Sequence, residues 1–312
     1  MHDDINELSL EELHERLAGT GLPRRAFELA RDEDLGTQGD LTSEAWFEHD
    51  ATLRASIAFR EAGVVCGLAF IDEICEVFTE ALQSRVAVDI HIPDGSCVEK
   101  GAAVATLTGA RSGVVGVERT ILNTVGRLSG IATLTAKFVE EAGNGGKQAG
   151  VLDTRKTTPG LRVLEKYAVR CGGGLNHRLG LHDAVLVKDN HIAGLTDGEL
   201  RERAESASRV GRELGASFIE IEVDRLEQLD ALLELEPGTV DIVLLDNMRN
   251  DLLREAVAKR DAKNPELLLE ASGNVRLETI AGIAQSGVDR ISAGALTHSS
   301  IWIDVGLDAI DG

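Results

Sequence analysis

Seven basic side chains are concentrated in residues 151–190, which hold only four acidic ones, so this stretch is net +3. The rest of the chain is net −24, and the 312 residues together have a formal charge of −21. A concentration of cations in an acidic protein indicates a site for a ligand with several negative charges. Three of the cations flank apolar runs, where a solvated charge is less natural, and these are the candidate ligand-binding cations: Arg155, Lys156 and Lys188.

Three other cations of the same stretch have a plainer interpretation. Arg162, Lys166 and Arg170 recur every four residues, which on a helix places them on one face. We expect that face to be solvated, or to pair with nearby acidic side chains, rather than to bind a ligand.

Two carboxylates, Glu222 and Asp246, follow successive apolar runs. Mg²⁺ binds one or two carboxylates together with substrate phosphates and water, so this pair suits a metal–pyrophosphate ligand. Salt bridges to nearby lysines and arginines are the alternative. Glu220 lies two residues before Glu222, so on a strand both side chains point to the same face.

Small residues follow the last two apolar runs. Two such loops in succession favour binding of a terminal phosphate through backbone N–H groups, although a single Ser-Gly is usually a simple turn. The loops contain Ser272, Gly273 and Asn274, and then Gly294 and Ala295.

His177 follows a run of three glycines, whose backbone can approach a ligand closely, and it precedes Arg178. A single histidine is often a buried structural residue with its hydrogen bonds satisfied. Its position leaves a structural role and a ligand-binding role equally open.

Six apolar runs alternate with helical stretches over the second half of the chain, which predicts βα units and a parallel sheet. In a βα barrel the reacting groups lie at the carboxyl ends of the strands, where the residues above are found. The region has fewer residues than the roughly 200 of a closed eight-stranded barrel, so a smaller or open barrel is expected. The runs are residues 151–154, 184–188, 218–223, 241–246, 266–272 and 290–294.

The first part of the chain reads as α+β. Short β-rich runs separated by turn residues span 51–109, and a helical pattern at 70–82 interrupts them. Two helices precede them: one over 9–17, where Ser9 and Glu12 have capping-box spacing, and one from about Arg24 to before Gly36. A long helical region over 118–143 follows, with a break expected near Ser129 and Gly130.

Composition excludes several function classes. A charge of −21 opposes binding to nucleic acids and anionic membranes, and 3% aromatic residues leave few stacking platforms for bases. No 18-residue apolar stretch predicts a membrane span, and the acidic start does not resemble a secretory signal. The cysteines are scattered without a C-x-x-C pair, which together with these absences predicts a cytoplasmic protein: Cys66, Cys75, Cys97 and Cys171.

Motifs over nearly the whole chain, in order, resemble the quinolinate phosphoribosyltransferase family. The most specific is DTRKTTPGLRVLEKYAVRCGGGLNHRLGLHDAVLVKDNHI at 153–192, in which no family position is replaced. The others are EDLGTQGDLTS (33–43), ERTILNTVGRLSGIAT (118–133), IEIEVD (219–224), LLDN (244–247), EASGN (270–274) and ISAGALTHS (291–299).

The resemblance implies a fold that is part α/β and part α+β. An N-terminal α/β sandwich domain would span residues 1–118 and an open, roughly seven-stranded α/β barrel would span 119–295. Residues after about 295 would pack back on the first domain. It also implies a homodimer, or a higher oligomer built from it, in which the N-terminal domain of one subunit covers the barrel mouth of the other.

The resemblance further implies a reaction, in which quinolinate and phosphoribosyl pyrophosphate give nicotinate mononucleotide, pyrophosphate and carbon dioxide, with Mg²⁺. Arg155, His177, Arg178 and Lys188 would bind quinolinate, joined by Arg119 from the neighbouring subunit. Lys156, Glu222 and Asp246 would be catalytic, and the two carboxylates would hold Mg²⁺ and the ribose or pyrophosphate. The 5′-phosphate would be bound by Ser272, Gly273, Asn274, Gly294, Ala295 and His298.

Three other functions compete with this hypothesis. A relative that accepts nicotinate would need fewer carboxylate-binding cations than this chain has. A Schiff-base aldolase barrel could use Lys188 at a strand end, but it leaves the cation cluster unexplained. A barrel without catalysis, serving as a binding protein, conflicts with the complete set of motif residues.

Overall fold

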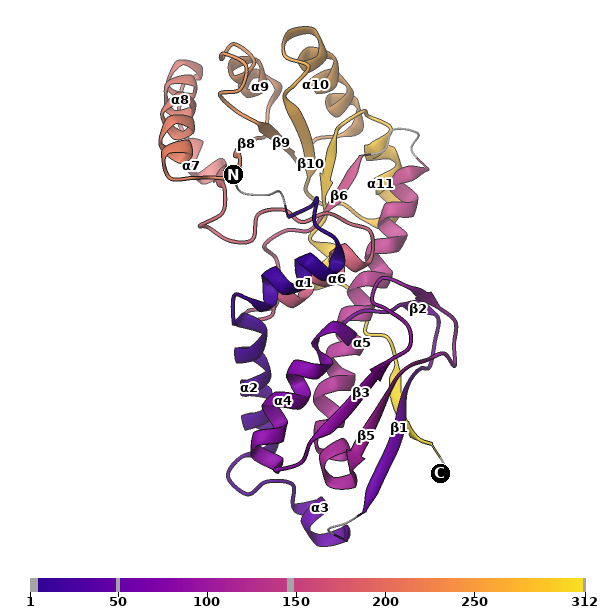
Figure 1. The fold of residues 1–312 in the computed structure, drawn as a ribbon. Coiled ribbons are helices and arrows are strands. Elements are labelled where there is room, and N and C mark those ends of the chain that lie inside the picture. The colour runs from indigo at the N-terminus through magenta and orange to yellow at the C-terminus, as the bar shows by residue number, and fades with distance from the viewer. Residues whose placement is uncertain (1–4, 49–50, 145–148, 311–312) are drawn as a thin grey trace. The chain divides into compact units, whose positions relative to one another are not determined.

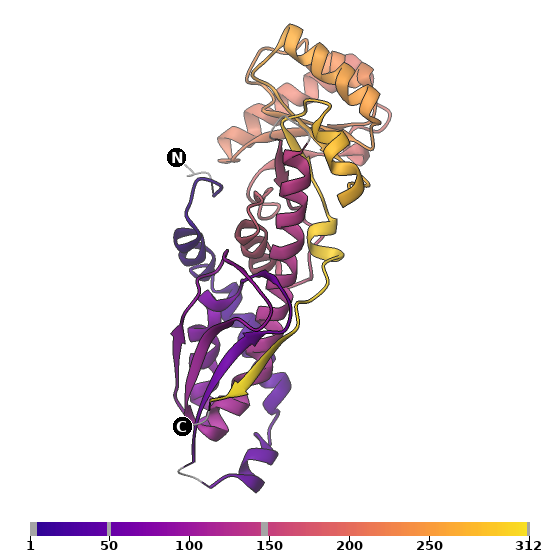
Figure 2. The ribbon, with the colours of Figure 1, turned by 90° about the vertical axis from the view of Figure 1, so that its right-hand side faces the viewer.

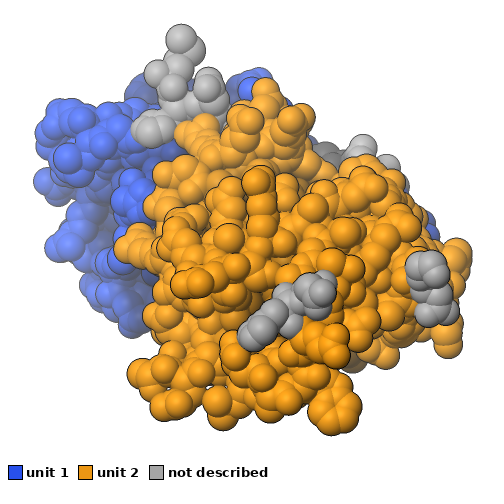
Figure 3. Space-filling model, turned by 60° about the horizontal axis from the view of Figure 1, so that its bottom comes forward, with its two compact units in different colours: residues 1–7, 137–156, 174–296 blue, residues 8–136, 157–173, 297–312 orange. Residues whose placement is uncertain are grey.

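A computed structural model describes residues 5–48, 51–144 and 149–310. These residues form two compact units, each assembled from several parts of the chain (Figure 3). The unit that we call the parallel-sheet unit contains residues 5–7, 137–144, 149–156 and 174–296. The antiparallel-sheet unit contains residues 8–48, 51–136, 157–173 and 297–310. The predicted boundary at residues 118 and 119 lies inside one helix, and both units are discontinuous.

The antiparallel-sheet unit is organised around a four-stranded sheet whose spatial order is β12, β1, β5 and β3. Figure 2 shows β12 beside β1, so the chain ends in the same sheet in which its strands begin. The small ribbon of β2 (Gly63–Val64) and β4 (Cys97–Val98) completes the unit's strands among the described residues. The four main strands are β1 (Thr52–Phe59), β3 (Val86–Ile90), β5 (Ala103–Ala110) and β12 (Val305–Ala309).

The helices of this unit follow the predicted apolar spacing. α1 (Leu10–Ala18) begins at Ser9, whose side chain accepts a hydrogen bond from the Glu12 N–H at 3.2 Å, and the predicted capping box is complete. α4 (Ile71–Leu82) agrees with the predicted helix and packs against β3 and α2 (Figure 1). α2 (Leu22–Leu35) begins two residues earlier than predicted, because Pro23 is accommodated in its first turn.

The expected break near Ser129 and Gly130 was wrong, since α5 (Arg111–Gly143) is one continuous helix. Both residues have tertiary roles instead. The buried Ser129 Oγ accepts a hydrogen bond from the Cys66 N–H at 3.0 Å, which ties the helix to the loop after β2. At Gly130 an added Cβ would lie 2.1 Å from the Ile301 carbonyl oxygen, so glycine is needed where the C-terminal segment crosses the helix.

α6 (Arg162–Cys171) contradicts the expected solvated cationic face. Lys166 is fully buried, and the helix is buried around most of its circumference because α1 and α2 pack against it. The Arg170 guanidinium donates to the Leu8 carbonyl at 2.9 Å and Arg162 Nε donates to Thr157 Oγ1 at 3.1 Å. These three cations are therefore structural. The helix belongs to the antiparallel-sheet unit, although it was expected in the barrel.

The parallel-sheet unit confirms the six predicted strands. They are all parallel, in the spatial order β6, β11, β10, β9, β8 and β7, and β8 is buried throughout. Where about seven strands were expected, the described residues have six and a one-residue bridge from Leu175 to Leu152 of β6. The strands are β6 (Gly150–Leu152), β7 (Val185–Val187), β8 (Ile219–Val223), β9 (Ile242–Asp246), β10 (Leu268–Ser272) and β11 (Arg290–Ser292).

Helices follow these strands along the chain and give the alternation that the sequence predicted (Figure 1). Strands buried on both faces need helices on both, which explains why their sequences are almost continuously apolar. None of the helices in the described part of the chain is long and apolar enough to cross a membrane. The main helices are α8 (Asp197–Glu213), α9 (Leu226–Leu232), α10 (Asn250–Lys263) and α11 (Leu277–Ala284).

Candidate active site

A cavity of about 620 Å³ lies in the parallel-sheet unit, where the carboxyl ends of the strands meet. In-register parallel strands end at one edge, which gathers side chains from distant parts of the sequence. Ten predicted site residues line it: Arg155, Lys156, His177, Arg178, Lys188, Glu222, Asp246, Ser272, Gly273 and Asn274.

Four other predicted site residues are not in the cavity wall. Gly294 and Ala295 follow β11 at the same carboxyl edge, and Ala295 begins the short helix α12 (Ala295–His298). His298 and Arg119 belong to the antiparallel-sheet unit. His298 is exposed and its Nδ1 is 2.8 Å from Ser299 Oγ, while the Arg119 side chain is 64% exposed.

Cations and carboxylates both face this cavity. Lys188 Nζ donates to Glu222 Oε2 at 3.0 Å, so the salt bridge that the sequence left open is present within the candidate site itself. The Lys188 side chain is still 47% exposed, which leaves its ammonium group accessible to a ligand. Arg155 Nε is buried without a hydrogen-bond partner among the described residues, and a buried donor of this kind gains from an anionic ligand.

The loops after β9 and β10 meet at the rim of the cavity. Asn247, Gly273 and Asn274 all have positive φ, at 54°, 93° and 50°. Asn274 Nδ2 donates to Asn247 Oδ1 at 2.9 Å, and Asn247 Nδ2 donates to Asp246 Oδ2 at 2.7 Å. An added Cβ at Gly273 would lie 2.3 Å from Asn247 Oδ1, so only glycine allows the two loops to approach this closely.

The buried carboxylate of Asp153 fixes the backbone just before His177 and Arg178. Asp153 is fully buried, and its two oxygens accept hydrogen bonds from the His177 N–H at 2.9 Å and from Asn176 Nδ2 at 2.7 Å. Asn6, near the N-terminus, binds the Asn176 backbone from the other side, accepting from its N–H at 2.7 Å. The backbone on which His177 and Arg178 stand is thus held at several points.

Behind His177 lies a second group of buried charges. Its Nε2 is 2.9 Å from Glu220 Oε2 and 3.5 Å from Glu270 Oε1, and Glu270 also pairs with Arg290 Nε at 2.8 Å. Burial by itself lowers the pKa of His177, but Glu270 and Glu220 outweigh it and the pKa is raised. Burial and the charge of Glu270 raise the pKa of Glu220. For Glu270, His177 and Arg290 outweigh burial and lower the pKa.

Comparisons with known proteins agree over both units. The family model of the quinolinate phosphoribosyl transferase N-terminal domain matches residues 40–129, and that of the C-terminal domain matches residues 131–308. The chain belongs to the quinolinate phosphoribosyl transferase family.

Named relatives and solved structures cover almost all of the chain. The nicotinate-nucleotide pyrophosphorylase [carboxylating] of Mycobacterium leprae is 41% identical over 293 residues, which is 90% of this chain and 98% of the relative. The probable enzyme of the same name from Bacillus subtilis is 40% identical over 276 residues, 88% of this chain and 89% of the relative. The solved nicotinate-nucleotide pyrophosphorylase of Francisella tularensis superposes with a TM-score of 0.81 at 32% identity, covering 99% of this chain and 100% of that one.

Motifs of the quinolinate phosphoribosyl transferase family also supply wall residues that the sequence prediction missed. Thr154 comes from the DTRK motif, and its Oγ1 accepts a hydrogen bond from the Lys156 N–H at 3.0 Å. Asn247 comes from LLDN, and Ser292 ends β11. Their signal was available, since Thr154 and Asn247 each neighbour a predicted site residue and Ser292 lies within a predicted strand.

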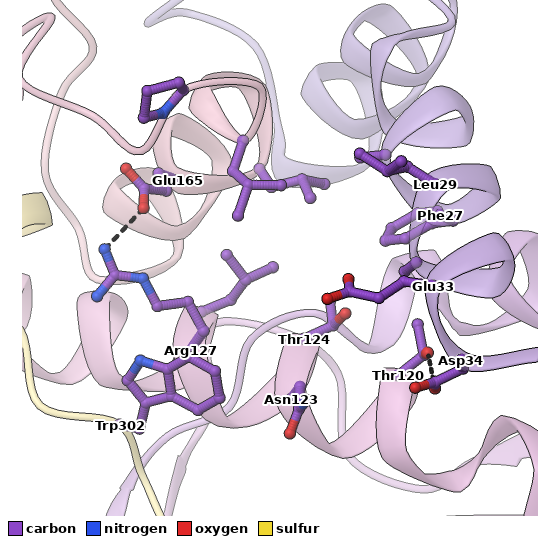
Figure 4. Close-up of a pocket in the computed structure, with 16 residues that line it drawn as sticks. Phe27, Leu29, Glu33, Asp34, Thr120, Asn123, Thr124, Arg127, Glu165 and Trp302 are labelled. Atoms are coloured by element: carbon purple, nitrogen blue, oxygen red, sulfur yellow. Dashed lines mark hydrogen bonds and ion pairs between the residues drawn. The ribbon is translucent and has the colours of Figure 1, made fainter. Parts of the chain in front are cut away.

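A second cavity, of about 440 Å³, lies within the antiparallel-sheet unit and contains one arginine, Arg127 (Figure 4). Its guanidinium donates to the buried Glu165 carboxylate at 2.7 Å, to the Thr297 carbonyl at 2.6 Å and to Ser300 Oγ at 2.8 Å. The charge of this arginine is therefore neutralised inside the protein. The cavity offers no cluster of cations comparable to that at the strand ends.

Proposed function

We propose that this protein transfers the phosphoribosyl group of phosphoribosyl pyrophosphate to quinolinate, giving nicotinate mononucleotide, pyrophosphate and carbon dioxide, as a step of NAD biosynthesis. The observation that supports this most strongly is the cavity at the strand ends. Four cations that suit a dianion line it together with two carboxylates that suit a metal-bound phosphate, and small loops that suit a terminal phosphate form its rim.

Quinolinate is a planar dianion, and planar guanidinium groups match carboxylates through two parallel hydrogen bonds. Arg155 and Arg178 bind its carboxylates in this proposal, and Lys188 adds a third cation. Burying a dianion is costly unless its charges are compensated, so several cations are required. This requirement favours quinolinate over nicotinate, which has only one carboxylate.

Mg²⁺ is also part of the proposal. Glu222 and Asp246 stand on neighbouring strands, face one cavity and offer the hard oxygen donors that Mg²⁺ prefers, so the residues present fit this ion. When bound, Mg²⁺ neutralises charge on the departing pyrophosphate. Lys188, which pairs with Glu222, and Asn247, which binds Asp246, hold the two carboxylates in position.

The transfer itself needs no general base, because the ring nitrogen of quinolinate has a free lone pair. As the bond from C1 of the ribose to the pyrophosphate oxygen breaks, Lys156 stabilises the negative charge that the leaving group gains. Glu222 and Asp246 suit the positive charge that develops at C1. The nitrogen then forms the new bond to C1 and becomes positive, so the adjacent carboxylate leaves as carbon dioxide and a proton from solvent replaces it at C2.

The loops with Ser272, Gly273 and Asn274 supply backbone N–H groups for the 5′-phosphate. The positive φ values of Gly273 and Asn274 give these loops an unusual backbone course at the rim. Gly294, Ala295 and His298 are proposed to complete the same phosphate site.

A homodimer with shared sites is a further part of the proposal. Arg119 on α5 is exposed and is the cation proposed to enter the partner's cavity. On the same unit, Leu29 and Trp302 border the second cavity and are 70% and 50% exposed. Large apolar side chains exposed together favour burial against another protein surface, here a second copy of this chain.

A cytoplasmic location also belongs to the proposal. It is supported by the four cysteines, which all lie among the described residues and are free thiols there.

One assay tests the function. The purified protein is given phosphoribosyl pyrophosphate and Mg²⁺ with either quinolinate or nicotinate, and carbon dioxide and the mononucleotide are both measured. We expect both products in equal amounts from quinolinate, and turnover of nicotinate lower by about 100-fold or more, because unpaired buried cations penalise the smaller ligand. Equal turnover of both acids would contradict the proposal, and so would the absence of mononucleotide formation from quinolinate.

A further inference from the structure

The segment of chain that carries Lys188 has few neighbours to hold it in place. Lys188 follows β7, the end strand of the parallel sheet, which among the described residues pairs with β8 alone and through three residues. It is followed by α7 (Asp189–Ile192), a single turn of helix. The position of this candidate ligand-binding cation must therefore come largely from local contacts.

The side chain of His191 supplies such a contact to the backbone of Lys188. The Lys188 N–H donates to His191 Nδ1 at 2.8 Å, and the His191 N–H donates to the Lys188 carbonyl at 2.7 Å. The Ile192 N–H adds a longer bond, at 3.3 Å, to the same carbonyl. The first of these bonds is the half of a capping box in which the third residue of a helix binds the N–H of the cap, with histidine in place of the usual Glu or Gln.

The other end of Lys188 is held separately. Its Nζ donates to Glu222 Oε2 at 3.0 Å, and Glu222 stands on β8, the strand that neighbours β7. His191 thus fixes the point where the lysine side chain begins, and Glu222 fixes its charged end. A long side chain that is held at both ends before binding loses less conformational entropy when a ligand is bound.

His191 is not among the described residues that line the cavity at the strand ends, although Lys188 is. It is exposed, and it borders two other cavities of the parallel-sheet unit, of about 490 Å³ and 160 Å³. Val187 of β7 also lines both of these cavities. His191 is therefore placed to act on the strand end that carries Lys188 and not on a ligand in the strand-end cavity.

We propose that His191 is a positioning residue, which fixes the backbone of Lys188 so that its ammonium group meets the carboxylate of the ligand. Nδ1 accepts the bond from the backbone N–H, so it carries no proton, and the neutral ring has its proton on Nε2. The proposal rests on the proposed function for the identity of the ligand. The hydrogen bond between His191 and Lys188 does not depend on that function.

The first test compares two variants of similar shape. Asn places its Oδ1 as many bonds from the backbone as Nδ1 of histidine, whereas Leu has a methyl group there. We expect His191→Asn to keep kcat/KM for quinolinate within about twofold of wild type, and His191→Leu to lower it about tenfold, mainly through KM, because one hydrogen bond is lost. Equal losses in the two variants, or nearly wild-type kinetics in His191→Leu, would overturn the proposal.

The second test removes the residue through which His191 is proposed to act. In a Lys188→Ala background, the difference between His191→Asn and His191→Leu should fall below about twofold, whereas an Arg119→Ala background should preserve it. An undiminished difference without Lys188 would overturn the proposal, since His191 would then act on another group. The thermal midpoint of every variant is measured, so that loss of folding is recognised.

The third test needs no activity. ¹⁵N NMR of the histidine side chains at about pH 8, with the His191 signals assigned from the His191→Asn variant, reports which ring nitrogen bears the proton. We expect an unprotonated Nδ1 and a protonated Nε2, and a proton on Nδ1 would overturn the proposal. If wild-type protein does not turn over quinolinate, the proposed function fails, while this measurement still tests the hydrogen bond to Lys188.

Discussion

Two of the cavities among the described residues, one in each unit, contain arginine, but the arginine charge is neutralised to different extents in them. In the antiparallel-sheet unit Arg127 is saturated by Glu165 and by backbone and hydroxyl oxygens. At the strand ends of the parallel-sheet unit, Arg155 Nε is buried without a hydrogen-bond partner among the described residues. Lys188 pairs with Glu222 but its side chain is still half exposed. The comparison teaches that a binding site is recognised by donor groups and charges that stay accessible to a ligand, and that a cavity containing an arginine is not sufficient.

The largest effect is expected from removing the two arginines of the cavity at the strand ends. Arg178→Ala and Arg155→Ala should each lower kcat/KM for quinolinate by about 1,000-fold, because each deletes charge-assisted hydrogen bonds to a buried carboxylate. Steady-state kinetics with both substrates varied will measure this. Nearly wild-type kinetics in both variants would remove the basis for assigning this cavity to the dianion.

Arg127, whose charge is neutralised by Glu165, should affect stability rather than catalysis. Arg127→Met leaves the buried Glu165 without its cation, and we expect the free energy of unfolding to fall by about 3 kcal/mol. Chemical denaturation measures the loss, and kcat/KM of the folded protein should change by less than about threefold. The control is Arg127→Met combined with Glu165→Gln, which removes both charges and should recover part of the stability. A large kinetic defect without loss of stability would make the second cavity functional after all.

Arg119 tests whether the antiparallel-sheet unit contributes a cation to a partner's cavity. Arg119→Ala alone should lose about 100-fold in kcat/KM. When it is mixed and refolded with inactive Arg178→Ala protein, half of the dimers are mixed and each has one intact site, so about a quarter of wild-type activity should return. No recovery in dimers shown to be mixed would argue against a shared site.

The smallest kinetic effect is expected at the rim of the strand-end cavity, where the loops after β9 and β10 meet. Gly273→Ala puts a Cβ against Asn247 at a backbone φ of 93°, and the loop must shift to accept it. We expect KM for phosphoribosyl pyrophosphate to rise about tenfold with little change in KM for quinolinate. Gly238→Ala is the matched control, because Gly238 also has positive φ, at 86°, but has open space around its Cβ position. If both variants behave alike, the contact with Asn247 has no particular role.

The sequence predicted the parallel strands and the residues at their ends well, for a physical reason. Strands buried on both faces read as apolar runs, and parallel strands bring their carboxyl ends together, so position along the chain was enough to place Glu222, Asp246 and Ser272 in one cavity. The N-terminal helices were also predictable, because capping and apolar spacing are local signals.

What the sequence could not give depends on contacts between distant residues. The charges of α6 indicated a solvated face, yet α1 and α2 bury it. Ser129 and Gly130 read as a helix break, although they serve a crossing loop and the C-terminal segment. The two ring nitrogens of His177 contact Glu220 and the next backbone N–H, and neither contact has a sequence signature.

The discontinuity of the two units has a consequence for how this architecture can be recombined. The chain leaves the parallel-sheet unit after Lys156 and returns at Gly174, and candidate site cations lie beside both crossings. Cutting the gene at either junction separates Arg155 and Lys156 from His177 and Arg178. The parallel-sheet unit therefore cannot be inherited, fused or exchanged as one uninterrupted module while keeping its cations, and the two units have to be passed on together.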